Sequence, residues 1–206
     1  MRKYLRDSGL TWALTALFAI SLGGMIWSGW LDAVEEARRH AAALPSLGGF
    51  LASGDFVSPL FENWESEFLQ MSVYVVLTAI LFQRGSAESR DPDDPEREGD
   101  EAGPGFGGWL YAHSLGLALA ALFVASFCLH AWGSWQMALE DAARHGEPGH
   151  GLRAHLGSAQ FWFESMQNWQ SEFLSTGVLV VLSIFLRHKG SPESKPVQAP
   201  DAQTGA

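Results

Sequence analysis

Two stretches of 21 residues without a single Asp, Glu, Lys or Arg constrain this chain more than any other feature. They run from Leu10 to Trp30 and from Leu115 to Trp135, and the second is equally apolar apart from His130. About 20 helical residues cross the roughly 30 Å hydrocarbon core of a bilayer. The sequence therefore predicts membrane-spanning helices over about 10–30 and 110–135.

Two further apolar blocks are shorter. Phe68–Phe82 and Phe173–Leu186 would extend at most about 22 Å as helices, at roughly 1.5 Å per residue. A span of about 20 residues that ends at the basic residues after each block gives helices over about 64–83 and 169–187. Each of these helices then includes an Asn-Trp-x-Ser-Glu-Phe-Leu segment.

Basic residues are unevenly distributed between the two sides of such a membrane protein. Short loops rich in Lys and Arg stay in the cytoplasm. The two termini and the central segment together hold more of them than the two remaining loops, which predicts that both termini are cytoplasmic. The first group is Arg2, Lys3, Arg6, Arg84, Arg90, Arg97, Arg187, Lys189 and Lys195, and the second is Arg38, Arg39, Arg144 and Arg153.

The chain contains an internal repeat with an offset of 105 residues. Residues 4–89 align without a gap on residues 109–194, with 34 identities in 86 positions. Because each copy holds two spans, both copies run in the same direction, and the pseudo-twofold axis lies along the membrane normal. The predicted fold is thus an all-α membrane protein, with four transmembrane helices formed by two parallel tandem repeats of a two-helix unit.

The predicted organisation has four parts. The segments between and after the repeats are too polar to offset their chain entropy by burial, and disorder is expected in both. The parts are repeat 1 over 1–89, an acidic cytoplasmic linker over 90–108, repeat 2 over 109–194 and a tail over 195–206.

Charge and cysteine content exclude some functions. The chain has 23 acidic and 13 basic residues and a net charge of −10, which argues against nucleic-acid binding because phosphates require a basic surface. Its one cysteine, Cys128, can form no intramolecular disulfide and no Cys-based zinc motif.

The same polar residues recur at equivalent places in the two repeats. Asn63 and Glu67 share one helix face, and Asn168 and Glu172 repeat them. Facing each other across the pseudo-twofold axis, the two pairs would form an acidic vestibule that attracts cations or hydrogen-bonds a polar ligand. The alternative is that these carboxylates only stabilise helix starts through the macrodipole.

Tryptophans cluster near the predicted membrane boundaries. The indole ring is apolar and its N–H seeks a polar partner, so tryptophan is favoured at the interface. The predicted interface anchors are Trp27, Trp30, Trp64, Trp132, Trp135 and Trp169.

A second shared set follows the first and third spans. His40 has Glu36 one turn back, and His145 has Asp141. Imidazole with carboxylate suits zinc or iron, so these four residues are candidate metal ligands at the outer face. The alternative is a solvated helical extension with i,i+4 ion pairs such as Glu35 with Arg39, and no HExxH spacing supports the metal.

No enzymatic motif is present. The sequence has no P-loop, no dinucleotide fingerprint and no GxSxG, so we expect no catalytic residues and no cofactor. Haem ligation is disfavoured because His113 and His130 correspond to Ser8 and Met25 in the first repeat, which leaves no histidines at matching depth on different helices.

Three segments of the chain are long enough to be specific. They are Phe-Glu-Asn-Trp-Glu-Ser-Glu-Phe-Leu-Gln from Phe61, Leu-Phe-Gln-Arg-Gly-Ser-Ala-Glu-Ser from Leu81, and the stretch from Phe161 to Leu174. These segments resemble a family of bacterial four-helix membrane proteins without assigned function. The resemblance covers nearly the whole chain and implies a bacterial inner-membrane location, but it supplies no catalytic or binding residues.

Three functions remain open from the sequence. The first is a non-enzymatic membrane component that binds a partner or polar ligand at its outer face. The second is a transport or permeation unit for small solutes or cations, and the third is a metal- or haem-dependent redox protein. The expected partners are the lipid bilayer and either further copies of the chain or another membrane protein, and no nucleic acid.

Overall fold

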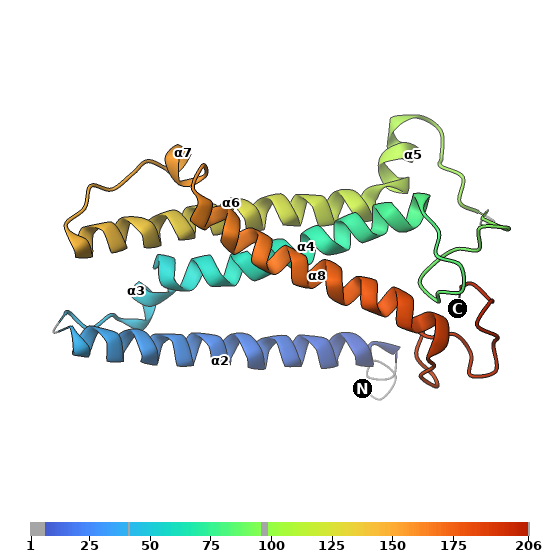
Figure 1. The fold of residues 1–206 in the computed structure, drawn as a ribbon, viewed down its shortest axis with the longest axis horizontal. Helices are drawn as coiled ribbons and strands as arrows, with labels where there is room; N and C mark the ends of the chain where they lie inside the picture. The colour runs from blue at the N-terminus through green and yellow to red at the C-terminus, as the bar shows by residue number, and fades with distance from the viewer. Residues whose placement is uncertain (1–6, 41, 96–98, 206) are drawn as a thin grey trace. The chain divides into compact units, whose positions relative to one another are not determined.

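The computed structural model describes residues 7–40, 42–95 and 99–205, which form seven helices. The predicted all-α class is confirmed. The long helices are α2 (Gly9–Arg39), α4 (Gly54–Ile80), α6 (Ser114–His145) and α8 (Ala159–Phe185), and the short ones are α3 (Leu47–Leu51), α5 (Gly105–Ala112) and α7 (Leu152–His155) (Figure 1). The basic residues Arg2, Lys3, Arg6 and Arg97 lie outside the described residues.

Two of the described helices, α2 and α6, are each long and apolar enough to cross a membrane. They contain the two long uncharged stretches of the sequence. Helices α4 and α8 have 27 residues each, and both begin ten residues before the predicted spans over 64–83 and 169–187. The added residues, 54–63 and 159–168, mix polar and hydrophobic side chains, so these helices could not be delimited from continuous apolar runs alone.

The chain divides into two compact units. The first unit consists of Met1–Pro59 with Trp132–Gly149, and the second of Leu60–Ala131 with His150–Ala206. Each unit takes segments from both halves of the sequence. The units and the predicted repeats are therefore different divisions of the chain.

Close backbone approaches hold the first unit together. A Cβ built on Gly133 of α6 would lie 2.6 Å from the backbone nitrogen of Ser58, and one on Gly54 would lie 2.6 Å from that of Met137. On α2, Gly29 leaves room for the ring of Phe50, the buried residue of α3. At Gly133 and Gly54 a side chain would meet backbone atoms and does not fit, whereas at Gly29 it would displace the ring of Phe50.

Aromatic rings and polar contacts hold the second unit together. Phe161 of α8 is fully buried, and its ring lies edge-on to that of Phe127 with the centroids 5.6 Å apart. Between α4 and α8, Nε2 of Gln70 donates to Oγ1 of Thr176 at 2.7 Å. The start of α8 is capped by Ser158, whose hydroxyl accepts from the backbone of Phe161. This cap fixes the end of α8 that carries the candidate site.

The two copies of Gly-Ser-x-Glu-Ser form turns with the same hydrogen bonds. In the first copy, Oγ of Ser86 accepts from the backbone nitrogen of Glu88 at 3.1 Å, and Oγ of Ser89 accepts from that of Gln83 at 2.8 Å. The equivalent bonds of the second copy measure 3.2 and 2.8 Å. The first glycine has φ of 85° at Gly85 and 87° in the second copy, a conformation that favours glycine.

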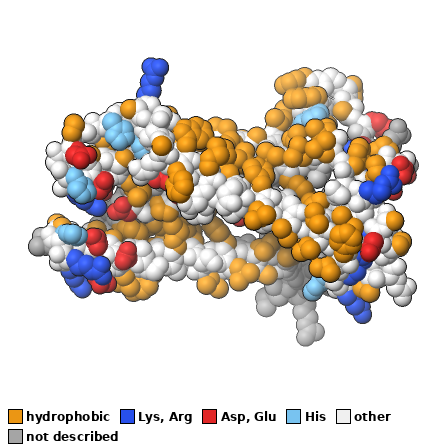
Figure 2. Space-filling model, in the orientation of Figure 1, with side chains coloured by type: hydrophobic (Ala, Val, Ile, Leu, Met, Phe, Trp, Pro, Cys, Tyr) orange, Lys and Arg blue, Asp and Glu red, His pale blue; other side chains and the backbone are white. Residues whose placement is uncertain are grey.

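Burial in the described chain is reversed relative to a water-soluble protein. Eleven of its buried residues are polar or charged and six are hydrophobic. Helix α2 has no buried residue, although it is largely apolar. Hydrophobic side chains cover much of the face drawn in Figure 2, and charged side chains gather toward the ends of the long helices. Soluble proteins bury apolar side chains first and bury charged ones rarely.

Candidate functional site

A buried histidine and a buried glutamate connect α6 and α4 in the second unit. Nδ1 of His130 lies 2.8 Å from Oε2 of Glu65, and neither side chain is exposed. An ionised carboxylate can only accept, so the imidazole donates this hydrogen bond. His130 comes from the apolar stretch of α6 and Glu65 from the polar first half of α4.

The second oxygen of Glu65 is also satisfied. Nε1 of Trp169 in α8 donates to Oε1 of Glu65 at 3.0 Å. The imidazole of His130 is covered on one face by the ring of Phe161, with centroids 5.1 Å apart and planes inclined by 27°. Three helices thus hold one carboxylate in place, and a ring shields its histidine partner from water.

Two more carboxyl groups surround this pair. Nε2 of His130 lies 3.7 Å from Oε2 of Glu164, longer than a hydrogen bond, and the side chain of Glu164 is 26% exposed. Nδ2 of Asn168 donates to Oε1 of Glu62 at 2.6 Å. These contacts define the His130 cluster, which consists of Glu62, Glu65, His130, Glu164, Asn168 and Trp169.

The His130 cluster has an excess of acidic groups. It holds three carboxyl groups and one imidazole, so protonation of His130 balances only one negative charge. Nε2 of His130 and Oγ of Ser165 are buried without a hydrogen-bond partner in the described structure. Buried charges need compensation, so this arrangement suits the uptake of a proton or the approach of a cation past Glu164.

The predicted vestibule residues come together in part. Asn168 belongs to the His130 cluster. Glu67 and Glu172, which are equivalent in the repeat, lie close enough for their charges to interact. Glu67 and Asn63 are exposed, and Glu172 is half-buried. The carboxylates at this end of α4 and α8 therefore extend from the His130 cluster to the surface of the second unit.

The predicted tryptophan anchors have different surroundings. Trp27 and Trp132 are exposed, as interface anchors would be. Nε1 of Trp30 donates to the backbone oxygen of Pro45 at 3.0 Å. Trp169 does more than anchor, because it hydrogen-bonds a buried carboxylate. The remaining two, Trp64 and Trp135, are half-buried.

The predicted metal ligands pair within their own helices. Nε2 of His40 lies 2.8 Å from Oε1 of Glu36, and Nδ1 of His145 lies 3.4 Å from Oδ1 of Asp141. All four side chains are exposed. Within the described ranges, no group of three or more His, Cys, Asp and Glu side chains could hold a metal ion. The geometry at these residues is that of i,i+4 pairs on solvated helix ends.

Sequence reasoning missed the carboxylates Glu62, Glu65 and Glu164. The repeat comparison selected residues shared by both copies, whereas Glu65 aligns with Gln170 and Glu164 with Pro59. One signal was available. Glu62 and Glu65 lie three residues apart, so they share a helix face with each other but not with the selected Asn63 and Glu67.

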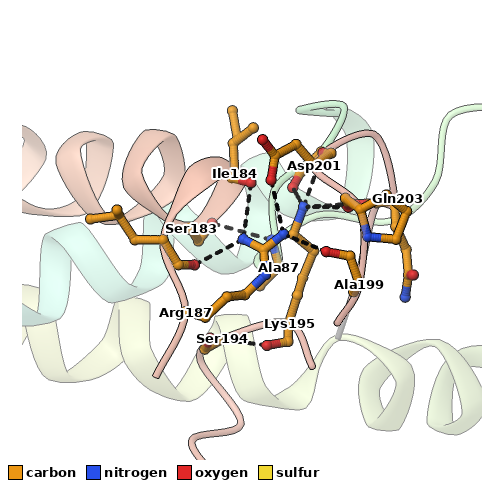
Figure 3. Close-up of polar contacts among 12 residues, drawn as sticks. Ala87, Ser183, Ile184, Arg187, Ser194, Lys195, Ala199, Asp201 and Gln203 are labelled. Atoms are coloured by element: carbon orange, nitrogen blue, oxygen red, sulfur yellow. Dashed lines mark hydrogen bonds and ion pairs between the residues drawn. The ribbon is translucent and has the colours of Figure 1, made fainter. Parts of the chain in front are cut away.

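A second buried ionisable group lies at the opposite end of α8. Nζ of Lys195, 1% exposed, donates to the backbone oxygens of Gly85, Asp201 and Gln203 at 2.5, 3.0 and 3.0 Å (Figure 3). Burial lowers the pKa of this ammonium, and the nearby charge of Arg187 lowers it further. The sequence predicts disorder from residue 195 onward. In the structure, this segment surrounds Lys195 with carbonyl groups.

The fold and the site define an all-α protein with two long apolar helices and a buried histidine–carboxylate cluster. The chain belongs to the family described as Domain of unknown function (DUF6766), whose family model matches residues 1–206. This agrees with the expectation of a family without assigned function that covers nearly the whole chain. No curated protein and no solved structure matches the chain.

Proposed function

We propose that the chain is a multi-pass protein of the bacterial cytoplasmic membrane, with four spans and both termini in the cytoplasm. The observation that carries this proposal is the reversed burial, with apolar α2 lacking any buried residue while His130 and Glu65 are fully buried. In lipid, apolar side chains that face outward carry no free-energy penalty. Backbone N–H and C=O groups at that depth must form their hydrogen bonds within helices. Helices α2 and α6 provide two spans by length and composition, and α4 and α8 provide the other two.

Cysteine labelling tests this topology. In a Cys128→Ala background, Ala43→Cys and Glu147→Cys place a thiol in the two loops expected outside, and Ala102→Cys and Ala202→Cys place one inside. A membrane-impermeant maleimide added to intact cells should label the first two variants only, and permeabilised cells should be labelled at all four. Labelling of all four in intact cells, or recovery of the protein in the soluble fraction, would overturn the proposal.

We further propose a non-enzymatic role in which the outer ends of α4 and α8 bind a polar, cationic ligand. The excess of carboxyl groups supports this role, since the His130 cluster continues into the Glu67 and Glu172 pair at the surface. Clefts lined by charge of one sign concentrate ligands of the opposite sign. A membrane partner with a basic segment would use the same carboxylates.

Ligand-induced stabilisation tests the outer site. A ligand that binds only the folded state raises the unfolding temperature. Purified protein is screened at constant ionic strength against calcium, putrescine, choline and a basic peptide. At least one should raise the unfolding temperature of the wild type and of the control Glu140→Gln, but not of Glu67→Gln combined with Glu172→Gln. If every probe acts equally on all three proteins, the outer site is not used.

Cation permeation is the second candidate, and one observation favours it. Polar contacts between α4 and α8 occur at successive levels, with Glu62 to Asn168 at one and Gln70 to Thr176 at the next. Proton and rubidium flux into liposomes tests this candidate. Flux that exceeds that of empty liposomes and falls in Glu65→Gln would favour permeation over binding alone.

A further inference from the structure

A cavity lies between α4 and α8 in the second unit, away from the outer carboxylates. Its volume is about 320 Å³, and its walls are mostly apolar, with contributions from Val73, Leu77, Phe173, Gly177 and Val180. This volume corresponds to about ten water-sized groups at roughly 30 Å³ each. Small-molecule sites begin at about this size and combine apolar walls with a few polar groups.

One end of the cavity carries a carboxyl group, and a second carboxyl group adjoins it. Glu88 lines the cavity, and its Oε2 accepts a hydrogen bond from the hydroxyl of Tyr74 at 3.2 Å. The carboxyl group of Glu193 lies within hydrogen-bonding reach of Glu88. These two glutamates occupy equivalent places in the two Gly-Ser-x-Glu-Ser turns. Burial raises the pKa of Glu88, and the neighbouring Glu193 raises it further.

No basic side chain of the described chain forms an ion pair with this carboxyl pair. Arg90, two residues after Glu88, is engaged elsewhere. Its guanidinium lies over the ring of Phe82, 5.4 Å from the centroid, and donates to the backbone oxygens of Ala79 and Pro95. Within the described part of the chain, the acidic end of the cavity therefore has no basic partner.

We propose that this cavity binds a single-chain amphiphile with an ammonium head, which sits against the pair of Glu88 and Glu193 while its alkyl chain lies along Gly177. A carboxyl pair beside an aromatic ring favours an ammonium group and disfavours an anion. The volume fits a chain of about ten heavy atoms and excludes a lipid with two full acyl chains. The contacts that carry this proposal are separate from those of the outer site.

Gly177 provides a way to close the cavity. A Cβ built on this residue meets no atom within 4 Å, so the space beside it is open. Glycine within a helix costs about 1 kcal/mol relative to alanine, so Gly177→Leu should fill the cavity without weakening α8. Gly24 of α2 also meets no atom within 4 Å, and Gly24→Leu is the matched control in the first unit.

Photolabelling in bilayer discs of phosphatidylcholine tests the proposal. The probe is decylamine with a photoreactive diazirine near the end of its chain, and mass spectrometry locates the labelled residues. We expect labels within 70–82 and 173–180. Decylamine should displace the probe at about one-tenth of the concentration that decanol requires, since a charge-assisted contact is absent from the alcohol. Decanoate should not displace it at the concentrations at which decanol does.

The variants give independent readouts. Gly177→Leu should lose labelling about tenfold, and Gly24→Leu should keep it. Glu88→Gln combined with Glu193→Gln should remove the preference for decylamine over decanol. Equal displacement by all three compounds in the wild type, or unchanged labelling in Gly177→Leu, would overturn the proposal. The wild-type comparison holds even if a variant fails to fold.

Discussion

Nδ1 of His130 donates to Oε2 of Glu65 across 2.8 Å, and neither side chain has any exposed surface. This bond joins α4 to α6 through two residues that are 65 positions apart in the sequence. Trp169 donates to the other oxygen of Glu65, so removal of this one carboxylate takes the partner from a buried imidazole and from a half-buried indole. Removal of either partner should therefore strongly lower the stability of the second unit.

Glu65→Ala should destabilise the protein strongly. Breaking a buried pair on one side costs about 3–5 kcal/mol because the remaining partner is buried and unpaired. The matched control is Glu35→Ala, which removes an exposed carboxylate 2.6 Å from Arg39 and should cost at most about 0.5 kcal/mol. Unfolding in detergent solution, followed by circular dichroism, measures both values. Equal losses would show that the pair contributes no more than a surface contact.

The sequence predicts the long helices well and the short ones not at all. The apolar stretches mark α2 and α6, and the predicted ion pair of Glu35 with Arg39 is present on the last turns of α2. Helices α3 and α7 have five and four residues, too few to show a helical period. Their start and end depend on contacts such as that of Phe50 with Gly29, which sequence periodicity does not reveal.

The predicted vestibule residues and the His130 cluster lie at the same end of α4 and α8, but none of the four predicted residues is fully buried. Comparison of the repeats selects shared residues, and Asn168 and Trp169 are the two members of the His130 cluster that the repeats share. His130 and Glu65 align with Met25 and Gln170, so the pair exists once in the chain. Its partners meet only through the packing of three helices, and no spacing in the sequence indicates that meeting.

Gly133→Ala should destabilise the first unit. The added methyl group would lie 2.6 Å from the backbone nitrogen of Ser58, which belongs to α4 and cannot move as a side chain does. Overpacking of this kind costs about 1–3 kcal/mol. In contrast, Gly24→Ala meets nothing within 4 Å and should stabilise α2 by up to about 1 kcal/mol. The unfolding temperatures of the two variants should therefore shift in opposite directions from that of the wild type. Shifts of the same sign would contradict this packing.

Stability should fall as the pH drops through the range in which His155 titrates. Burial lowers the pKa of His155 below its ordinary value of 6.5, and the charges of His150 and His130 lower it further, outweighing Glu164. The unfolded chain then binds a proton more readily than the folded one. This contribution to stability is complete above pH 6.5 and is lost as the pH falls toward the lowered pKa.

Unfolding free energies at pH 7.5 and 5.5 measure this effect. His155→Gln removes the titrating group, so its stability should change less between the two pH values than that of the wild type. His145→Gln serves as control because His145 is exposed and should leave the wild-type slope intact. A slope in His155→Gln equal to that of the wild type would assign the pH dependence to other groups.

The two equivalent turns should respond differently to the same substitution. Gly85 and Gly190 have φ of 85° and 87°, so alanine at either place is strained by about 1–2 kcal/mol. A Cβ on Gly85 would in addition lie 2.6 Å from the backbone oxygen of Asp201, whereas one on Gly190 meets nothing within 4 Å. Gly85→Ala should therefore cost more than Gly190→Ala.

Asparagine separates the two causes. It tolerates the left-handed conformation better than alanine, so Gly190→Asn should recover part of the stability that Gly190→Ala loses. Gly85→Asn should recover little, because its Cβ still meets the backbone of Asp201, which lies next to the carbonyl groups around Lys195. The unfolding free energies of the four variants, measured with a chemical denaturant, test this difference between the turns. If asparagine rescues both turns equally, the C-terminal segment does not pack on Gly85 in solution.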